Sequence, residues 1–228
     1  MNIATRSDIG IKYSNNEDYV GYKEFEDITV LAIADGIGGE ACGEYASKLA
    51  VDSILELCGT ELAGNFSSLT NDDIKSRYNE FFDKINKKIL LATLENPELK
   101  GTGSTLTVVT IFNRSIYITH IGDSRAYLLH GASITQLTKD HSESNRLTKS
   151  LGVNEFLEPD FYCYNIIYGD VILMCTDGIH SVVTNREILP CVKKHNDLEG
   201  GLTNLFNKAY ECGSEDNITA LLAHIRPS

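Results

Sequence analysis

The sequence predicts a layered α+β sandwich, in which helices lie outside packed antiparallel sheets. Three observations predict this fold class: strand-like runs open the chain, two amphipathic helical patterns follow them, and a second block of strands precedes two shorter helices and a last strand. Helices and strands that occur in separate blocks are typical of antiparallel sheets with helices segregated on their outer faces.

Strands and two helices are expected in the N-terminal part. Apolar or alternating runs rich in β-branched residues predict three strands, at 2–8, 19–23 and 28–35. Apolar residues at steps of three and four from Ala41 predict a helix, with Gly59 beyond its end. The same spacing between Ile74 and Leu94 predicts a second, longer helix.

The rest of the chain predicts a strand meander followed by helices. Strand patterns separated by short turns occur at 104–112, 115–122, 125–130 and 133–137. After a polar, weakly patterned segment at 139–158, two more strands are expected at 161–168 and 170–176. Helices are expected at 187–194 and 198–211, and a last strand at 217–225.

Length and charge limit the possible functions. The 228 residues are expected to form a single domain, 1–228, and the formal net charge is −12. This charge argues against a nucleic-acid or anionic-membrane partner, because both bind patches of Lys and Arg. It is compatible with bound cations.

Two further patterns bear on location. The chain opens without a secretory signal pattern and contains no apolar stretch of the roughly 20 residues that a membrane span requires, so we expect a cytoplasmic protein. Its six cysteines form no CxxC pair, which favours buried free thiols over a zinc or redox site.

Four aspartates stand where an apolar strand meets a turn. Each precedes a small or turn-forming residue, in Asp35-Gly36, Asp123-Ser124, Asp177-Gly178 and Asp216-Asn217. A single Asp-Gly is more often a turn than a ligand, but four in one context favour convergence at a sheet edge. Converging carboxylates repel unless they hold a cation, and oxygen ligands alone select Mg²⁺ or Mn²⁺ over zinc.

The glycines after Asp35 allow a tight turn into the following helix. They lack the Lys of the GxxxxGK[ST] loop that cradles nucleotide phosphates, so a nucleotide-binding P-loop is excluded.

Seven short blocks follow one another between Thr5 and Ile225. They read SDIGIKYSNNED, IADGIGG, GTGSTLTVVTI, IGDSRAYLL, LTKDHS, VILMCTDGI and SEDNITALLA. Together they resemble the metal-dependent protein phosphatase family, the type 2C Ser/Thr phosphatases, in its bacterial form. The resemblance implies a four-layer αββα sandwich, with two antiparallel sheets flanked by helix pairs and a binuclear metal cleft at one edge.

The resemblance also implies roles for individual residues. Asp35 is the carboxylate that bridges two metal ions and Gly36 is a backbone carbonyl ligand, while Asp177 and Asp216 complete the other ion. Asp35, Asp177 and Asp216 are therefore the expected catalytic residues.

Further residues are implied to lie around the two ions. Asp18 is expected to hold a metal-bound water, with Glu17 alongside, and Asp123 is expected to reach a third, weaker ion. The implied reaction is direct hydrolysis of phosphoserine or phosphothreonine by a water bridging two Mn²⁺ or Mg²⁺ ions, without a covalent phosphoenzyme.

The sequence departs from the family at the phosphate-binding position. Relatives usually carry an Arg before the NED block, whereas Tyr13 stands here with Lys12 beside it. These two residues are candidate substrate-phosphate ligands, although a hydroxyl and a point charge bind phosphate less well than the bidentate guanidinium. Neighbouring strand residues face opposite ways, so Lys12 can substitute only where the chain is not a regular strand.

Two other departures concern the cleft surroundings. The acidic residue that supports the third ion in relatives is replaced by Ser181, and His180 beside it is a candidate substitute. The flap between the DHS block and the TDG strand is expected to be shortened, because only residues 143–158 intervene.

The expected partner is a phosphorylated protein, with the enzyme acting as a monomer and opposing a Ser/Thr kinase. One alternative is a pseudophosphatase or regulatory binding module that retains the fold and the metal site. Clustered carboxylates are costly without a cation, which weighs towards catalysis. An acidic scaffold, whose aspartates are only turn residues, leaves the seven ordered blocks unexplained.

Overall fold

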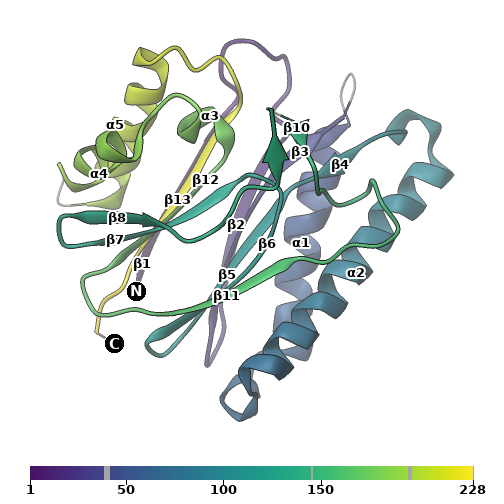
Figure 1. Ribbon diagram of the computed structural model, residues 1–228, viewed down its shortest axis with the longest axis horizontal. Helices are drawn as coiled ribbons and strands as arrows, with labels where there is room; N and C mark the ends of the chain where they lie inside the picture. Colours follow the sequence, from purple (N-terminus) through teal and green to yellow (C-terminus); the bar gives the residue numbers. More distant parts are fainter. Residues whose placement is uncertain (39–41, 145, 195–196, 228) are drawn as a thin grey trace.

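The protein consists of two large antiparallel sheets packed face to face, with helices on both outer faces (Figure 1). This computed structural model describes residues 1–38, 42–144, 146–194 and 197–227. The long helices α1 and α2 cover one sheet, and the shorter α3, α4 and α5 lie against the other. The predicted four-layer α+β sandwich is confirmed.

The first sheet joins the two ends of the chain. Its order is β1-β13-β12-β7-β8, and β1 pairs with β13 from Asn2 opposite His224 to Asp8 opposite Ile218. The strands are β1 (Asn2–Asp8), β7 (Arg125–His130), β8 (Ser133–Gln136), β12 (Val171–Cys175) and β13 (Ile218–His224).

The second sheet has the order β11-β6-β5-β3-β2, and the short β4 pairs with the end of β3. Its strands are β2 (Asp18–Glu24), β3 (Thr29–Ile37), β4 (Gly103–Ser104), β5 (Leu106–Phe112), β6 (Ser115–Ile121) and β11 (Asp160–Asn165). A separate two-stranded hairpin is formed by β9 (Ser142–Glu143) and β10 (Arg146–Leu147).

Side chains cap free backbone N–H groups at the starts of α2, α4 and α5, whereas Cys42 before α1 and Thr176 before α3 make no such bond. The helices are α1 (Gly43–Glu61), α2 (Asn71–Glu95), α3 (Asp177–His180), α4 (Asn185–Lys193) and α5 (Leu198–Glu211), with single 3₁₀ turns at Phe66–Ser68 and Pro97–Leu99. Thr70 with Asp73 and Thr184 with Glu187 form capping boxes at the starts of α2 and α4. Such reciprocal bonds fix where a helix begins.

Alternation along β3 divides the core into layers. Val30 and Ala32 belong to the apolar cluster beneath α1 and α2, whereas Leu31 and Ile33 belong to the cluster between the two sheets. Successive strand residues face opposite sides, so one apolar run serves both layers. A third apolar cluster, which includes Phe206, lies between the first sheet and α5.

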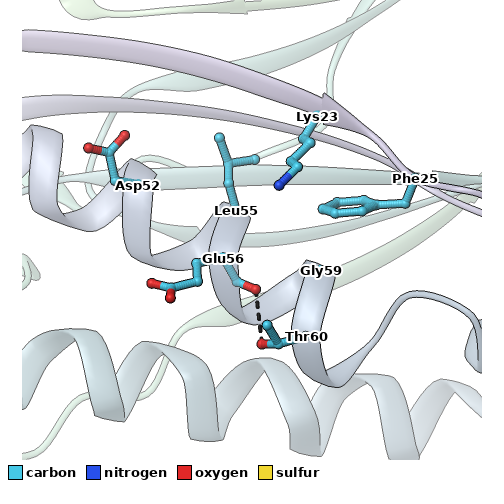
Figure 2. A pocket seen from close by; sticks show the side chains of 7 residues that line it. All are labelled: Lys23, Phe25, Asp52, Leu55, Glu56, Gly59 and Thr60. Carbon is cyan, nitrogen blue, oxygen red and sulfur yellow. Dashed lines mark hydrogen bonds between the residues drawn. The ribbon is translucent and has the colours of Figure 1, made fainter.

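Helix α1 continues past the residue at which the sequence predicts its end. Gly59 lies inside the helix, where the ring of Phe25 packs against it. A Cβ added at Gly59 would lie 2.5 Å from that ring, so the close contact requires glycine here (Figure 2). The prediction that Gly59 stands beyond the helix was therefore wrong. The expected start at Ala41 lies outside the described residues.

One other local prediction was wrong, and one helix was missed. The expected strand 104–112 is interrupted at Thr105, which separates β4 from β5, and the single-turn helix α3 was not predicted. A four-residue helix is too short to produce a helical period in the sequence.

Among the described residues, no helix is both long and apolar enough to cross a membrane. All six cysteines are free thiols.

Phe82, which is fully buried between α2 and the second sheet, should contribute strongly to stability. Phe82→Ala is expected to lower the free energy of unfolding by about 3–5 kcal/mol, because it leaves a cavity in a packed core. Leu94→Ala, at a side chain of the same helix that is 79% exposed, should change it by less than about 0.5 kcal/mol. Urea denaturation measures both values, and equal effects would contradict the packing described.

Candidate active site

A cleft of about 900 Å³ opens at the edge of the sandwich where the ends of both sheets meet. It brings together most of the predicted site residues, which come from separate parts of the chain. Its lining includes Tyr13, Glu17, Asp35, Gly36, Asp123, Arg146, Leu147, Asp177, Asp216 and Asn217. Asp18 is almost fully buried, at 6% exposure, and is not among the lining residues; neither is Lys12.

Asp18 and Asp35 face one another across two strands. They are directly paired in the register of β2 and β3, so both side chains project from the same face of the sheet. The Thr176 hydroxyl, on the other sheet, donates a 2.8 Å hydrogen bond to Asp18 Oδ2. Burial, and then the neighbouring Asp177 and Asp216, raise the pKa of Asp18 to about 7 despite that bond.

The backbone of Asp35 is fixed on both sides by residues next to β5. Its N–H donates to Thr105 Oγ1 at 2.8 Å, and its carbonyl accepts bonds from the Thr105 N–H and the Ser104 hydroxyl. Burial and the adjacent Asp18 and Asp177 raise the pKa of Asp35 well above its usual value. The carboxylate is therefore held rigidly in a position that disfavours its charge.

Asp177 enters the cleft as the first residue of α3. The single turn is closed by bonds from the Ser181 N–H and hydroxyl to the Asp177 carbonyl. Burial, followed by Asp216 and Asp123, raises the pKa of Asp177 to about 6. Ser181 thus supports this turn through backbone contacts.

Asp216 is joined to the N-terminal loop by its neighbour Asn217. The Asn217 amide donates to the carbonyls of Ile9 and Asn15, while its oxygen accepts from the Glu17 N–H. Gly10, with φ +73°, lies against the Asp216 carbonyl, where a Cβ would come within 2.0 Å. One amide side chain therefore ties residues 9–17 to the turn that carries Asp216.

Asp123 lies on a turn supported from beneath by histidines. His180 Nε2 donates to the Asp123 carbonyl at 2.9 Å, so this imidazole holds the backbone of the turn. The His141 ring stacks on the fully buried His120 ring with centroids 5.0 Å apart, and its Nδ1 accepts from the Gly122 N–H. Burial raises the pKa of Asp123 as well.

The donor set fits divalent cations. Burial, and then repulsion from nearby carboxylates, raises the pKa values of four carboxyl groups, Asp18, Asp35, Asp123 and Asp177, which is the electrostatic state that a bound cation relieves. All these donors are oxygens, as Mg²⁺ and Mn²⁺ prefer. Among the described residues, no group of three or more His, Cys, Asp or Glu side chains is already arranged to hold a metal ion. The fit therefore rests on donor chemistry and convergence.

The two candidate phosphate ligands lie differently. Tyr13 is 47% exposed and lines the cleft, whereas the Lys12 ammonium lies over the Tyr13 ring, 4.9 Å from its centroid. Contact with Tyr13 raises the pKa of Lys12. The loop residues Ile11 and Lys12 both donate backbone bonds to the Glu215 carbonyl, so this stretch is not a regular strand.

Three residues of the site were not predicted from the sequence. Thr176 and Asn217 act through hydrogen bonds between distant segments, and neither residue type is distinctive alone. Asn217 follows Asp216 directly, which could have indicated a shared turn. Arg146 lies in the segment with the weakest pattern, and no motif in the sequence singles it out.

A fold of this kind, with acidic residues gathered at one edge of a β-sandwich, defines a candidate metal-dependent hydrolase. A family profile described as protein phosphatase 2C matches residues 11–223. The chain belongs to the protein phosphatase 2C family.

Relatives and solved structures cover nearly the whole chain. The serine/threonine phosphatase stp of Listeria monocytogenes is 30% identical over 97% of this chain and 95% of its own. Protein phosphatase PhpP of Streptococcus pneumoniae is 29% identical, over 97% and 96%.

Two solved structures are similar throughout. Stp1 from Staphylococcus aureus has a TM-score of 0.89 at 26% identity and covers 99% of this chain and 95% of its own. The catalytic domain of PstP, solved with two manganese ions, has a TM-score of 0.85 at 30% identity over 99% and 98%.

His120 should make stability depend on pH. Burial, and then the neighbouring His141, lower the pKa of His120 to about 4, below the value of about 6.5 for an unfolded histidine. The native state then binds fewer protons than the unfolded state between pH 6.5 and 4. This contribution is fully present above about pH 6.5 and is lost as the pH falls.

The measurement is urea denaturation of wild type and His120→Asn at pH 7 and pH 5. The variant is expected to lose about 1–2 kcal/mol less than wild type on acidification. Other buried groups, such as His180, titrate in both proteins and cancel in the comparison. An identical loss in the two proteins would show that His120 is not held neutral.

Proposed function

We propose that the protein is a metal-dependent serine/threonine phosphatase that hydrolyses phosphoserine and phosphothreonine with two divalent cations, Mn²⁺ or Mg²⁺. The observation that carries this proposal is the convergence of Asp35, Asp177 and Asp216 from both sheets in one cleft. Membership of the protein phosphatase 2C family supports the same activity.

Each donor would have its own part in holding the ions. Asp35 would bridge both ions, the Gly36 carbonyl would complete one, and Asp177 and Asp216 would bind the other. Asp18 would act from below through a water, and Asp123 would reach a third, weaker ion. His180 already donates to the Asp123 carbonyl, which supports a positioning role for it over that of an ion ligand.

The described residues around the cleft would align the carboxylates that hold the ions, and they offer no cysteine nucleophile. When bound, the divalent ions supply a nucleophilic water at neutral pH and offset charge on the transferring phosphoryl group. The hydrogen bonds of Thr105 and Thr176 keep Asp35 and Asp18 aligned for that task. No cysteine is among the described lining residues, which argues against a cysteinyl-phosphate intermediate.

We also propose the setting of this activity. The partner would be a phosphorylated protein, and the enzyme would act as a monomer that opposes a Ser/Thr kinase. Six free thiols favour a reducing, cytoplasmic environment. Residues 1–228 would form one catalytic domain, because both helix layers pack on a shared pair of sheets.

Turnover of p-nitrophenyl phosphate and of a phosphothreonine peptide tests the proposal. Wild type should hydrolyse both in Mn²⁺ or Mg²⁺ and lose activity in EDTA. Asp35→Asn and Asp177→Asn should each lower kcat by about 100-fold or more, because a neutral amide oxygen binds a divalent ion less strongly than a charged carboxylate does. Asp83→Asn, at an exposed residue paired with Lys87, is the matched control and should retain full activity.

Calorimetry with Mn²⁺ separates the alternatives. Retained metal binding without turnover would favour a regulatory module that keeps the metal site. Turnover that persists in EDTA, or that survives both substitutions, would contradict the metal-dependent mechanism.

A further inference from the structure

The cleft carries more negative charge than two divalent metal ions would neutralise. The acidic residues Glu17, Asp35, Asp123, Asp177 and Asp216 line it, and Asp18 lies beneath. Two divalent ions carry four positive charges, fewer than the number of these carboxylates. A phosphate dianion therefore needs an additional cationic donor close to the ions.

The N-terminal loop does not supply that donor inside the cleft. Tyr13, at the position where relatives usually carry Arg, offers one neutral hydroxyl to the cleft. The Lys12 ammonium lies on the face of the Tyr13 ring and is attracted by Asp216 and Glu215. The Lys12 ammonium therefore already has partners, and it is not among the residues that line the cleft.

Arg146 is the one basic side chain among the described residues that line the cleft. It belongs to the β9–β10 hairpin, where it lies opposite Glu143 in the strand register. Among the described residues it forms no ion pair. Arg146 is exposed and lines the cleft, so its guanidinium remains available to a ligand there. Its planar donors match phosphate oxygens in a bidentate manner.

The hairpin is fixed to the carboxylate-bearing segments by backbone hydrogen bonds. Before it, the His141 N–H donates to the Gly122 carbonyl at 2.7 Å, next to Asp123. After it, Leu151 exchanges two backbone bonds with Ser104, whose hydroxyl also binds the Asp35 carbonyl. The hairpin therefore stands at a set position relative to Asp35 and Asp123. In Figure 1, it lies beside the end of β3.

We propose that Arg146 binds the substrate phosphate in this protein and replaces the N-terminal arginine that Tyr13 has displaced. This inference rests on the proposed phosphatase function. Arg146 then sets affinity for the phosphoryl group from the hairpin side of the cleft, and it takes no part in metal binding.

Binding of inorganic phosphate to the Mn²⁺-loaded protein tests this directly by calorimetry. Arg146→Ala should weaken phosphate binding by about 10- to 100-fold, the range for a lost charge-assisted hydrogen-bond pair. Arg146→Lys should recover part of the loss, because it restores charge without the bidentate geometry. The Mn²⁺ affinity should stay within twofold of wild type in both variants.

Two further variants separate the role of the guanidinium from a structural effect. Glu143→Ala alters the hairpin opposite Arg146 without removing the cation and should leave phosphate binding unchanged. Tyr13→Arg placed in the Arg146→Ala protein should restore phosphate affinity, because it supplies a guanidinium from the loop.

Kinetics give the corresponding result. Arg146→Ala should raise KM for p-nitrophenyl phosphate by a factor similar to the loss in phosphate affinity and lower kcat less. Unchanged phosphate affinity in Arg146→Ala would overturn the inference, and so would an equal loss in Glu143→Ala. Absence of turnover by wild type would contradict the proposed function and leave the phosphate-binding result as the test of Arg146.

Discussion

The repulsion among buried carboxylates is the constraint on which the rest of this structure depends. Asp35 and Asp18 are paired across β2 and β3, and Asp177 follows β12 of the other sheet. Besides burial, Asp18 and Asp177 raise the pKa of Asp35, and Asp177 also raises the pKa of Asp18. A buried charge without a partner costs several kcal/mol, and it is normally removed by protonation or by a cation. Packing elsewhere in the protein must therefore offset the free-energy cost of burying these carboxylates. The three apolar clusters on either side of and between the sheets provide it.

Rigid support for the carboxylates comes from residues that join distant segments. Thr176 connects the first sheet to Asp18, Thr105 connects Asp35 to the hydroxyl of Ser124 after Asp123, and Asn217 connects the Asp216 turn to the N-terminal loop. In each case a small polar side chain satisfies backbone or carboxylate atoms that would otherwise be buried without partners. Repelling groups remain close together because their backbones cannot move apart.

The sequence predicted the aspartates of the cleft better than the residues that hold them in place. Asp35, Asp123, Asp177 and Asp216 could be found because each stands where an apolar strand meets a turn, and strand ends converge at a sheet edge. Gly59 was wrongly placed beyond the end of α1, because its contact is with the ring of Phe25, which follows β2 and is distant in the sequence. Thr105 interrupts the predicted strand and accepts a hydrogen bond from the Asp35 N–H, and no local sequence pattern indicates that contact. Asn217 and Arg146 were missed for the same reason, since their roles exist only between segments.

The metal donors and the phosphate-facing cation stand on parts of the fold with different constraints. Asp35 is held within a paired strand, where displacement would break ladder bonds and the contacts of Thr105. Arg146 stands on a two-stranded hairpin that reaches its neighbours through backbone bonds at His141 and Leu151. A backbone bond is indifferent to side-chain identity, so the hairpin can vary in its exposed side chains while its position is kept. Recognition of a phosphorylated partner can therefore differ between such proteins without disturbing the carboxylates proposed to hold the ions, because side chains on the hairpin can change while its backbone bonds keep its position.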